Sequence, residues 1–184
     1  MTFHILGISG SLRKASFNTA ALRAVGELLP EGVTFEIAEI GDLPLYNEDL
    51  RVNGSFPPEV QRLREQIAKA DGLVFAVPEY NYSVSPAMKN AIDWASRAPN
   101  QVFDWKPYAM IGAATGLFGT VRAQMALRQI LFGINAYPVN NPQVMIAGAA
   151  QKFDAEGKLT DQAARDLITQ LIHALVKLAG KLKA

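Results

Sequence analysis

The chain of 184 residues contains no cysteine. Disulfide bonds, thiolate nucleophiles, iron–sulfur clusters and thiol-based zinc sites are therefore excluded. Histidine is also scarce, because His4 and His173 are the only two imidazoles in the sequence. We therefore expect no metal site.

Neither sign of charge is in excess, since 18 Lys and Arg residues face 17 Asp and Glu residues. No dense Lys/Arg run precedes the last predicted helix, so a nucleic-acid partner is not expected. No apolar run approaches the ~18 residues that cross a membrane, and the N-terminus lacks the pattern of a signal peptide. We therefore expect a cytoplasmic protein with no membrane partner.

The hydrophobic fraction of 49% and the charged fraction of 19% are typical of a globular protein. The length fits one domain, residues 1–184, with a full core. Apolar, β-branched runs alternate with helical patterns, which implies βαβ units and a parallel sheet with right-handed crossovers. The predicted strands are 3–8, 34–40, 73–77, 109–113 and 137–146, and the predicted helices are 19–29, 58–70, 86–96, 120–132 and 161–181.

Five strands and five helices predict an α/β fold of the flavodoxin-like type, a doubly wound three-layer sandwich with strand order 2-1-3-4-5. In this fold a ligand lies at the carboxyl ends of strands 1 and 3. The loops after strands 1, 3 and 4 should therefore converge. The long segment 41–57, rich in Gly and Pro, is interpreted as an ordered flap or an interface loop.

The first of these loops, segment 10–18, has the sequence G-S-L-R-K-A-S-F-N. It offers the hydroxyls of Ser11 and Ser16, the guanidinium of Arg13 and the amide of Asn18, and it contains no acid. Its position before a helix predicts an anion site, and its pattern is neither a Walker loop nor G-x-G-x-x-G. Such a loop suits the single phosphate of flavin mononucleotide (FMN). A Gly/Ser connection with an N-cap and no ligand is the alternative.

The second loop, segment 78–86, places Tyr80, Asn81 and Tyr82 between prolines that restrict the backbone. Backbone N–H donors and aromatic walls would suit a planar heteroaromatic ring, whereas a packed lid is the alternative. The third loop, segment 114–119, carries two glycines that permit close backbone approach. On its own it is also compatible with an ordinary turn that opens a helix.

The combination of G-S-L-R-K-A-S-F-N, P-E-Y-N-Y-S and K-N-A-I-D-W resembles the NADPH-dependent FMN reductase family, in particular its quinone, chromate and ferric reductase branch. The resemblance runs in order over most of the chain, and P-L-Y-N at 44–47 and L-R-Q at 127–129 also fit. It implies non-covalent FMN, NADH or NADPH as co-substrate, and dimers or tetramers with the flavin near a subunit boundary. One departure is Ser85-Pro86-Ala87, where many relatives have a Pro-Gly turn.

The resemblance also assigns contacts to particular residues. The phosphate and ribityl contacts fall on Ser11, Arg13, Ser16, Phe17 and Asn18. The isoalloxazine contacts fall on Pro78, Glu79, Tyr80 and Asn81, with further contacts from the backbone of Ala114, Thr115 and Gly116.

We interpret the reaction as a ping-pong cycle in which nicotinamide reduces the flavin and leaves before a quinone, flavin, chromate or ferric acceptor binds. Backbone N–H groups of segment 79–81 would stabilise the negative charge on the ring. No side-chain acid or base is required, so no catalytic residue is named. Arg97 is expected at the loop edge, either steering an anion or capping its helix. The physiological acceptor and the choice between NADH and NADPH stay open.

Two other functions compete with a reductase. A flavodoxin-type electron shuttle usually has a Thr-rich phosphate loop and an acidic surface, which Arg13-Lys14 and the near-zero net charge do not match. A serine hydrolase using Ser9 or Ser11 would lack the second glycine of G-x-S-x-G and a credible histidine base.

The predicted helix 121–132 is apolar around much of its circumference, with Met125 and Phe132 beyond what one core face needs. This pattern predicts a contact between subunits.

Overall fold

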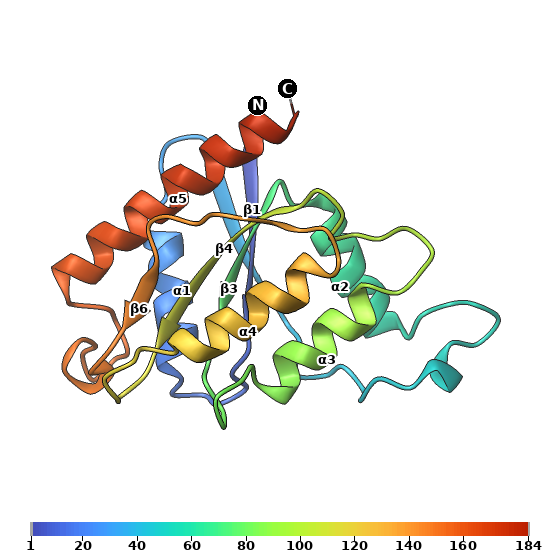
Figure 1. Ribbon diagram of the computed structural model, residues 1–184, viewed down its shortest axis with the longest axis horizontal. Coiled ribbons are helices and arrows are strands. Elements are labelled where there is room, and N and C mark those ends of the chain that lie inside the picture. Colours follow the sequence, from blue (N-terminus) through green and yellow to red (C-terminus); the bar gives the residue numbers. More distant parts are fainter. Residues whose placement is uncertain (1, 184) are drawn as a thin grey trace.

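The computed structural model describes residues 2–183 and has a central parallel sheet (Figure 1). The strand order is β2-β1-β3-β4-β5, which confirms the predicted topology. The fifth predicted strand is two short strands that both pair with β4, because residues 140–143 leave the sheet around Pro142, which has no N–H to donate. The strands are β1 (Phe3–Ser9), β2 (Val33–Ala38), β3 (Gly72–Ala76), β4 (Pro107–Ala113), β5 (Tyr137–Pro138) and β6 (Val144–Ile146).

Helices cover both faces of the sheet and make three layers. Strands β3 and β4 are buried along their whole length, as expected for strands covered on both sides. One face carries α1 (Phe17–Glu27) and α5 (Gln162–Lys183), and the other carries α2 (Pro58–Lys69), α3 (Pro86–Ala95) and α4 (Val121–Phe132). Successive side chains of β3 pack on opposite faces: Val74 lies in the core under α1 and α5, and Phe75 lies in the core under α2, α3 and α4.

Helix α1 begins two residues before its predicted start at Thr19. The side chain of Ser16 accepts a hydrogen bond from the backbone N–H of Thr19, which makes Ser16 the N-cap. The other helices begin and end within two residues of the predicted positions. Within residues 2–183, no helix combines the length and apolar character needed to cross a bilayer.

Segment 41–57 is an ordered flap that extends from the body on the side of α2 and α3 (Figure 1). It contains the short 3-10 helix η1 (Glu48–Leu50) and is held on α3 by hydrogen bonds. The side chain of Asn90 accepts from the N–H of Tyr46 and donates to the carbonyl of Pro44, to which Trp94 also donates. These bonds explain why a segment with little regular structure keeps one path.

All strands are parallel, so their carboxyl ends share one edge, at the bottom of Figure 1. The loops that follow β1, β3 and β4 converge at this edge, as the topology predicts.

Candidate ligand site

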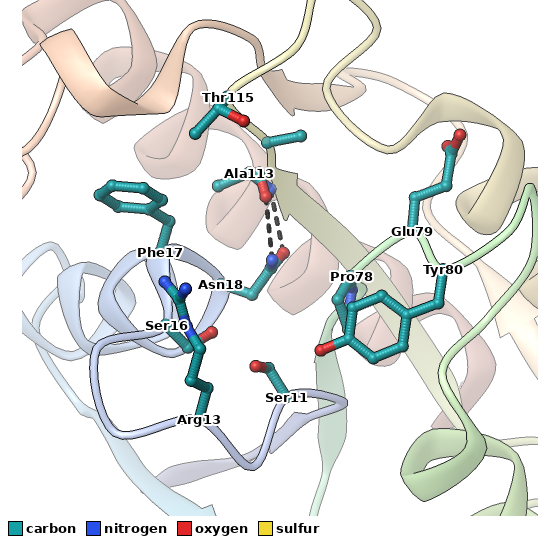
Figure 2. A pocket seen from close by; sticks show the side chains of 11 residues that line it. Ser11, Arg13, Ser16, Phe17, Asn18, Pro78, Glu79, Tyr80, Ala113 and Thr115 are labelled. Atoms are coloured by element: carbon teal, nitrogen blue, oxygen red, sulfur yellow. Dashed lines mark hydrogen bonds between the residues drawn. The ribbon is translucent and has the colours of Figure 1, made fainter.

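A pocket of about 470 Å³ opens between the loops after β1, β3 and β4 (Figure 2). All of the predicted contact residues line it except Asn81 and Gly116. Those two line an adjoining pocket of about 370 Å³, which shares Glu79 and Ala114 with the first. The first pocket is lined by Ser11, Arg13, Ser16, Phe17, Asn18, Pro78, Glu79, Tyr80, Ala113, Ala114 and Thr115.

Gly10 lets the first loop pack directly on the second. A Cβ atom at this position would lie 2.8 Å from Pro78 Cδ and 2.8 Å from Ser85 Oγ, which is too close for any other residue. The buried hydroxyl of Ser85 donates to the carbonyl of Gly10 at 2.6 Å and accepts from the N–H of Met88 at 3.2 Å. Ser85 therefore caps α3 and joins the two loops, which accounts for the Ser-Pro sequence at the exit of the second loop.

The start of α1 gives one end of the pocket a positive character. Its first turn contains no acid, and among the described residues the N–H groups of Phe17 and Asn18 have no hydrogen-bond acceptor. Free N–H groups at a helix N-terminus attract anions. In Figure 2 the guanidinium of Arg13 and the hydroxyls of Ser11 and Ser16 lie around the same end of the pocket.

Asn18 lines the pocket, but its amide group is engaged elsewhere. Its Nδ2 donates to the carbonyl of Ala113 at 2.9 Å, and its Oδ1 accepts from the N–H of Ala113 at 3.0 Å (Figure 2). Because Asn18 is buried, this pair of bonds fixes the start of α1 against the end of β4. Its side chain therefore positions the first loop relative to the third.

The second loop contains a tight two-residue turn. The backbone groups of Tyr80 and Ser83 exchange hydrogen bonds of 3.0 Å in both directions, and the residues between them, Asn81 and Tyr82, have φ of 49° and 69°. Left-handed backbone costs about 1–3 kcal/mol per residue and is concentrated at functional sites. Tyr80 is 47% exposed and Tyr82 is 71% exposed, so the packed-lid alternative is wrong.

The carboxylate of Glu79 points away from the Arg13 end of the pocket and toward α4 (Figure 2). It accepts from the N–H of Arg122 at 3.0 Å, from Arg122 Nη1 at 2.9 Å and from the N–H of Ala123 at 3.3 Å. Thr120, the residue before α4, provides no side-chain cap, so Glu79 caps this helix from another loop. Burial alone would raise the pKa of Glu79, but Arg122 and the two N–H groups hold it below its ordinary value of 4.5.

Arg97 does not lie at the pocket, so the expected position at the loop edge is wrong. Helix α3 begins at the pocket edge and runs away from it, and Arg97 lies about 16 Å beyond Pro86 at a rise of about 1.5 Å per residue. Its Nη2 donates to Ser96 Oγ at 3.0 Å, and its guanidinium lies 5.5 Å from the centre of the Tyr46 ring. Arg97 directly follows the C-terminal end of α3, where a positive charge is favourable, so its position fits the helix-capping alternative.

Comparison with known proteins agrees with this architecture. The model of the family described as NADPH-dependent FMN reductase matches residues 3–151. The chain belongs to this family. An NAD(P)H-dependent FMN reductase of Pseudomonas aeruginosa is 55% identical over 171 residues, which cover 93% of this chain and 92% of that protein. A quinone reductase of Escherichia coli K12 is 38% identical over 97% of this chain and 96% of that protein.

A solved structure shows the same fold throughout. FerB, a flavoenzyme NAD(P)H:(acceptor) oxidoreductase from Paracoccus denitrificans, matches with a TM-score of 0.88 at 32% identity, over 98% of each chain. The flavodoxin-like fold predicted for this FMN reductase family member is therefore confirmed.

Sequence reasoning missed three residues of this site. Ala113 lines the pocket through the end of β4, and only the strand register shows it. Arg122 pairs with Glu79 across 43 positions, and Ser85 bonds to Gly10 across 75 positions. The one available signal was Ser85 itself, because Ser followed by Pro is typical of a helix N-terminus.

Proposed function

We propose that this FMN reductase family member binds FMN non-covalently in the pocket and passes electrons from NADH or NADPH to quinones, flavins, chromate or ferric complexes. The observation that carries this proposal is the set of donors at the Arg13 end of the pocket, which we call the phosphate end. Two hydroxyls, one guanidinium and two free helix N–H groups gather there, while the single nearby acid, Glu79, is turned away. A phosphate dianion fits this donor set.

The phosphate end explains how the cofactor is held and selected. Hydrogen bonds from Arg13, Ser11 and Ser16 to a charged phosphate are worth about 1.5–3 kcal/mol each. The β1–α1 loop packs closely on Pro78 and Ser85 at Gly10, which restricts the space beside it. The phosphate end therefore suits one terminal phosphate. We therefore propose FMN rather than FAD.

The second and third loops form the part of the site that suits a planar ring. Pro78 and Tyr80 provide the walls of the main pocket, and Asn81 and Gly116 bring backbone into the adjoining pocket. Together these volumes lie in the range of about 300–1,000 Å³ that small-molecule sites occupy. The N–H groups of Tyr80 and Ser83 are bonded within the turn, which leaves those of Asn81 and Tyr82 at the loop tip, where they would stabilise negative charge on a bound ring.

FMN, when bound, supplies the hydride and electron transfer chemistry. The contribution of the chain is to bind and orient, because Glu79, the carboxylate that lines the pocket, is already bonded to Arg122 and to helix N–H groups. We therefore assign no catalytic acid or base. The open pocket lets donor and acceptor use the same ring face in turn.

Steady-state kinetics test this function. Initial rates with NADPH and a quinone, varied against each other, should give parallel double-reciprocal lines, as expected for a ping-pong enzyme. Intersecting lines would mean that donor and acceptor bind together, which contradicts a shared ring face.

We further propose that the protein forms homodimers or tetramers through α4. Phe132 is 83% exposed and Met125 is 59% exposed, whereas Leu127 and Leu131 on the same helix are buried in the core. Such exposed apolar side chains on a helix favour an interface between copies of the chain.

A further inference from the structure

A second pocket lies on the other side of the β1–α1 loop. The chain leaves β1 toward the face that carries α1, but it leaves both neighbouring strands, β2 and β3, toward the face that carries α2 and α3. Crevices form at a sheet edge where adjacent connections diverge. The β1–α1 loop therefore has a crevice on each side: the proposed flavin pocket toward β3, and a pocket of about 390 Å³ toward β2.

Positive charge dominates this second pocket. Arg13, Lys14 and Arg23 line it, and Glu39 is the only acid among its lining residues. Within residues 2–183, no carboxylate forms an ion pair with any of these three cations. One oxygen of Glu39 accepts from the N–H of Gly41 at 2.7 Å, so this acid is held at the end of β2 by its own turn.

The remaining lining residues suit a nucleoside. Leu12 is 59% exposed and Ile37 is 38% exposed, and both provide apolar surface for a planar base. The hydroxyls of Ser9 and Thr19 on the same wall hydrogen-bond to each other at 2.8 Å, and each still has lone-pair capacity that a sugar hydroxyl could use. A cationic pocket with apolar and hydroxyl walls fits a phosphorylated nucleoside.

We propose that this pocket binds the 2′-phosphoadenosine end of NADPH and thereby makes NADPH the preferred donor over NADH. The inference rests on the proposed reductase function. Adjacent strands lie about 4.8 Å apart, so a ring near the ends of β3 and β4 is separated from this pocket by two to three spacings, about 10–14 Å. An extended dinucleotide covers that distance, and Arg13, which lines both pockets, lies along its path.

Binding to the FMN-saturated protein tests the pocket without turnover. We expect 2′,5′-ADP, measured by calorimetry, to bind at least about tenfold more tightly than 5′-AMP, which lacks the 2′-phosphate. The variant Lys14→Ala/Arg23→Ala should weaken 2′,5′-ADP about tenfold and change 5′-AMP less than about twofold. The isosteric variant Glu39→Gln should strengthen 2′,5′-ADP by removing the one negative charge. Lys177→Ala, at an exposed position on α5, is the matched control.

Two results would overturn the proposal. Equal affinity for 2′,5′-ADP and 5′-AMP would remove the role of the 2′-phosphate. Inorganic phosphate that binds as tightly as 2′,5′-ADP would reduce the pocket to a general anion site.

Kinetics separate this inference from the proposed function. In Lys14→Ala/Arg23→Ala the ratio of kcat/KM for NADPH to kcat/KM for NADH should fall about tenfold, while the NADH rate and the bound FMN stay unchanged. A flavin-loaded, active enzyme whose ratio does not fall would refute the NADPH pocket alone. A wild-type protein that holds no FMN, or that oxidises neither nucleotide, would instead refute the proposed function.

Discussion

Replacing Glu79 with glutamine should destabilise the protein and weaken FMN binding together. The carboxylate accepts from Arg122 Nη1 and from two N–H groups in the first turn of α4, at distances of 2.9, 3.0 and 3.3 Å. Glutamine keeps the shape and one acceptor oxygen, but its NH2 group then faces donors. The substitution therefore breaks the link between the second loop and α4 without opening a cavity.

The expected loss follows from the burial of the pair. The side chain of Glu79 is 15% exposed and that of Arg122 is 32% exposed. A hydrogen bond to a charged group contributes about 1.5–3 kcal/mol when buried, and partial exposure reduces this value, so we expect a loss of about 2 kcal/mol. For a chain of this size, 1 kcal/mol lowers Tm by about 2–4 °C, which gives a decrease of about 4–8 °C.

The effect should depend on pH with a defined sign. The pKa of Glu79 is lower in the folded protein than its ordinary value of 4.5, so its contribution is complete above pH 4.5 and is lost as the pH falls through the folded value. The stability difference between the wild type and Glu79→Gln should therefore be full at pH 7 and shrink below pH 4.5.

Chemical denaturation at several pH values and fluorescence titration with FMN measure both effects. Asp93→Asn is the matched control, because it removes an acid from a surface i,i+4 pair with Lys89, worth about 0.3–0.5 kcal/mol. A loss for Glu79→Gln no larger than that of the control, or unchanged FMN affinity, would refute the argument that this carboxylate holds the loop.

Three further results are expected. Arg13→Ala should raise the Kd for FMN by about one to two decades, through the loss of about 1.5–3 kcal/mol, with the fold intact; unchanged affinity in a flavin titration would mean that the phosphate lies elsewhere. Mass spectrometry of ligand released by heat should find FMN, and the presence of FAD would contradict the single-phosphate cradle. Phe132→Glu should shift the protein to a smaller species in light scattering, and an unchanged mass would exclude the exposed face of α4 as the interface.

The strand order was predictable because each strand and helix has its own local signal. The apolar runs ending at Ser9 and Ala76 and the helical spacing after Pro86 do not depend on distant residues. Once the order is known, chain connectivity brings the first, third and fourth carboxyl-edge loops together, and residues such as Ser11 and Tyr80 fall into one pocket.

The side-chain partners were not predictable, because they join distant parts of the sequence. The bonds between Asn18 and Ala113 span 95 positions, and neither partner has a pattern that indicates the other. Glu79 was correctly placed beside the pocket, but nothing local shows that its carboxylate turns toward α4. The expected position of Arg97 at the loop edge was wrong because α3 begins at the second loop and runs away from the pocket, which places Arg97 beyond its far end.

The most direct test of the reductase function is anaerobic mixing of the flavin-loaded protein with NADPH, followed by its visible absorbance. An open ring face predicts bleaching within seconds without any partner reductase, and recovery of the colour when a quinone is added. A flavodoxin-type shuttle, whose ring is enclosed, would bleach slowly. Reduction that takes many minutes at millimolar NADPH would contradict the reductase function and favour the shuttle.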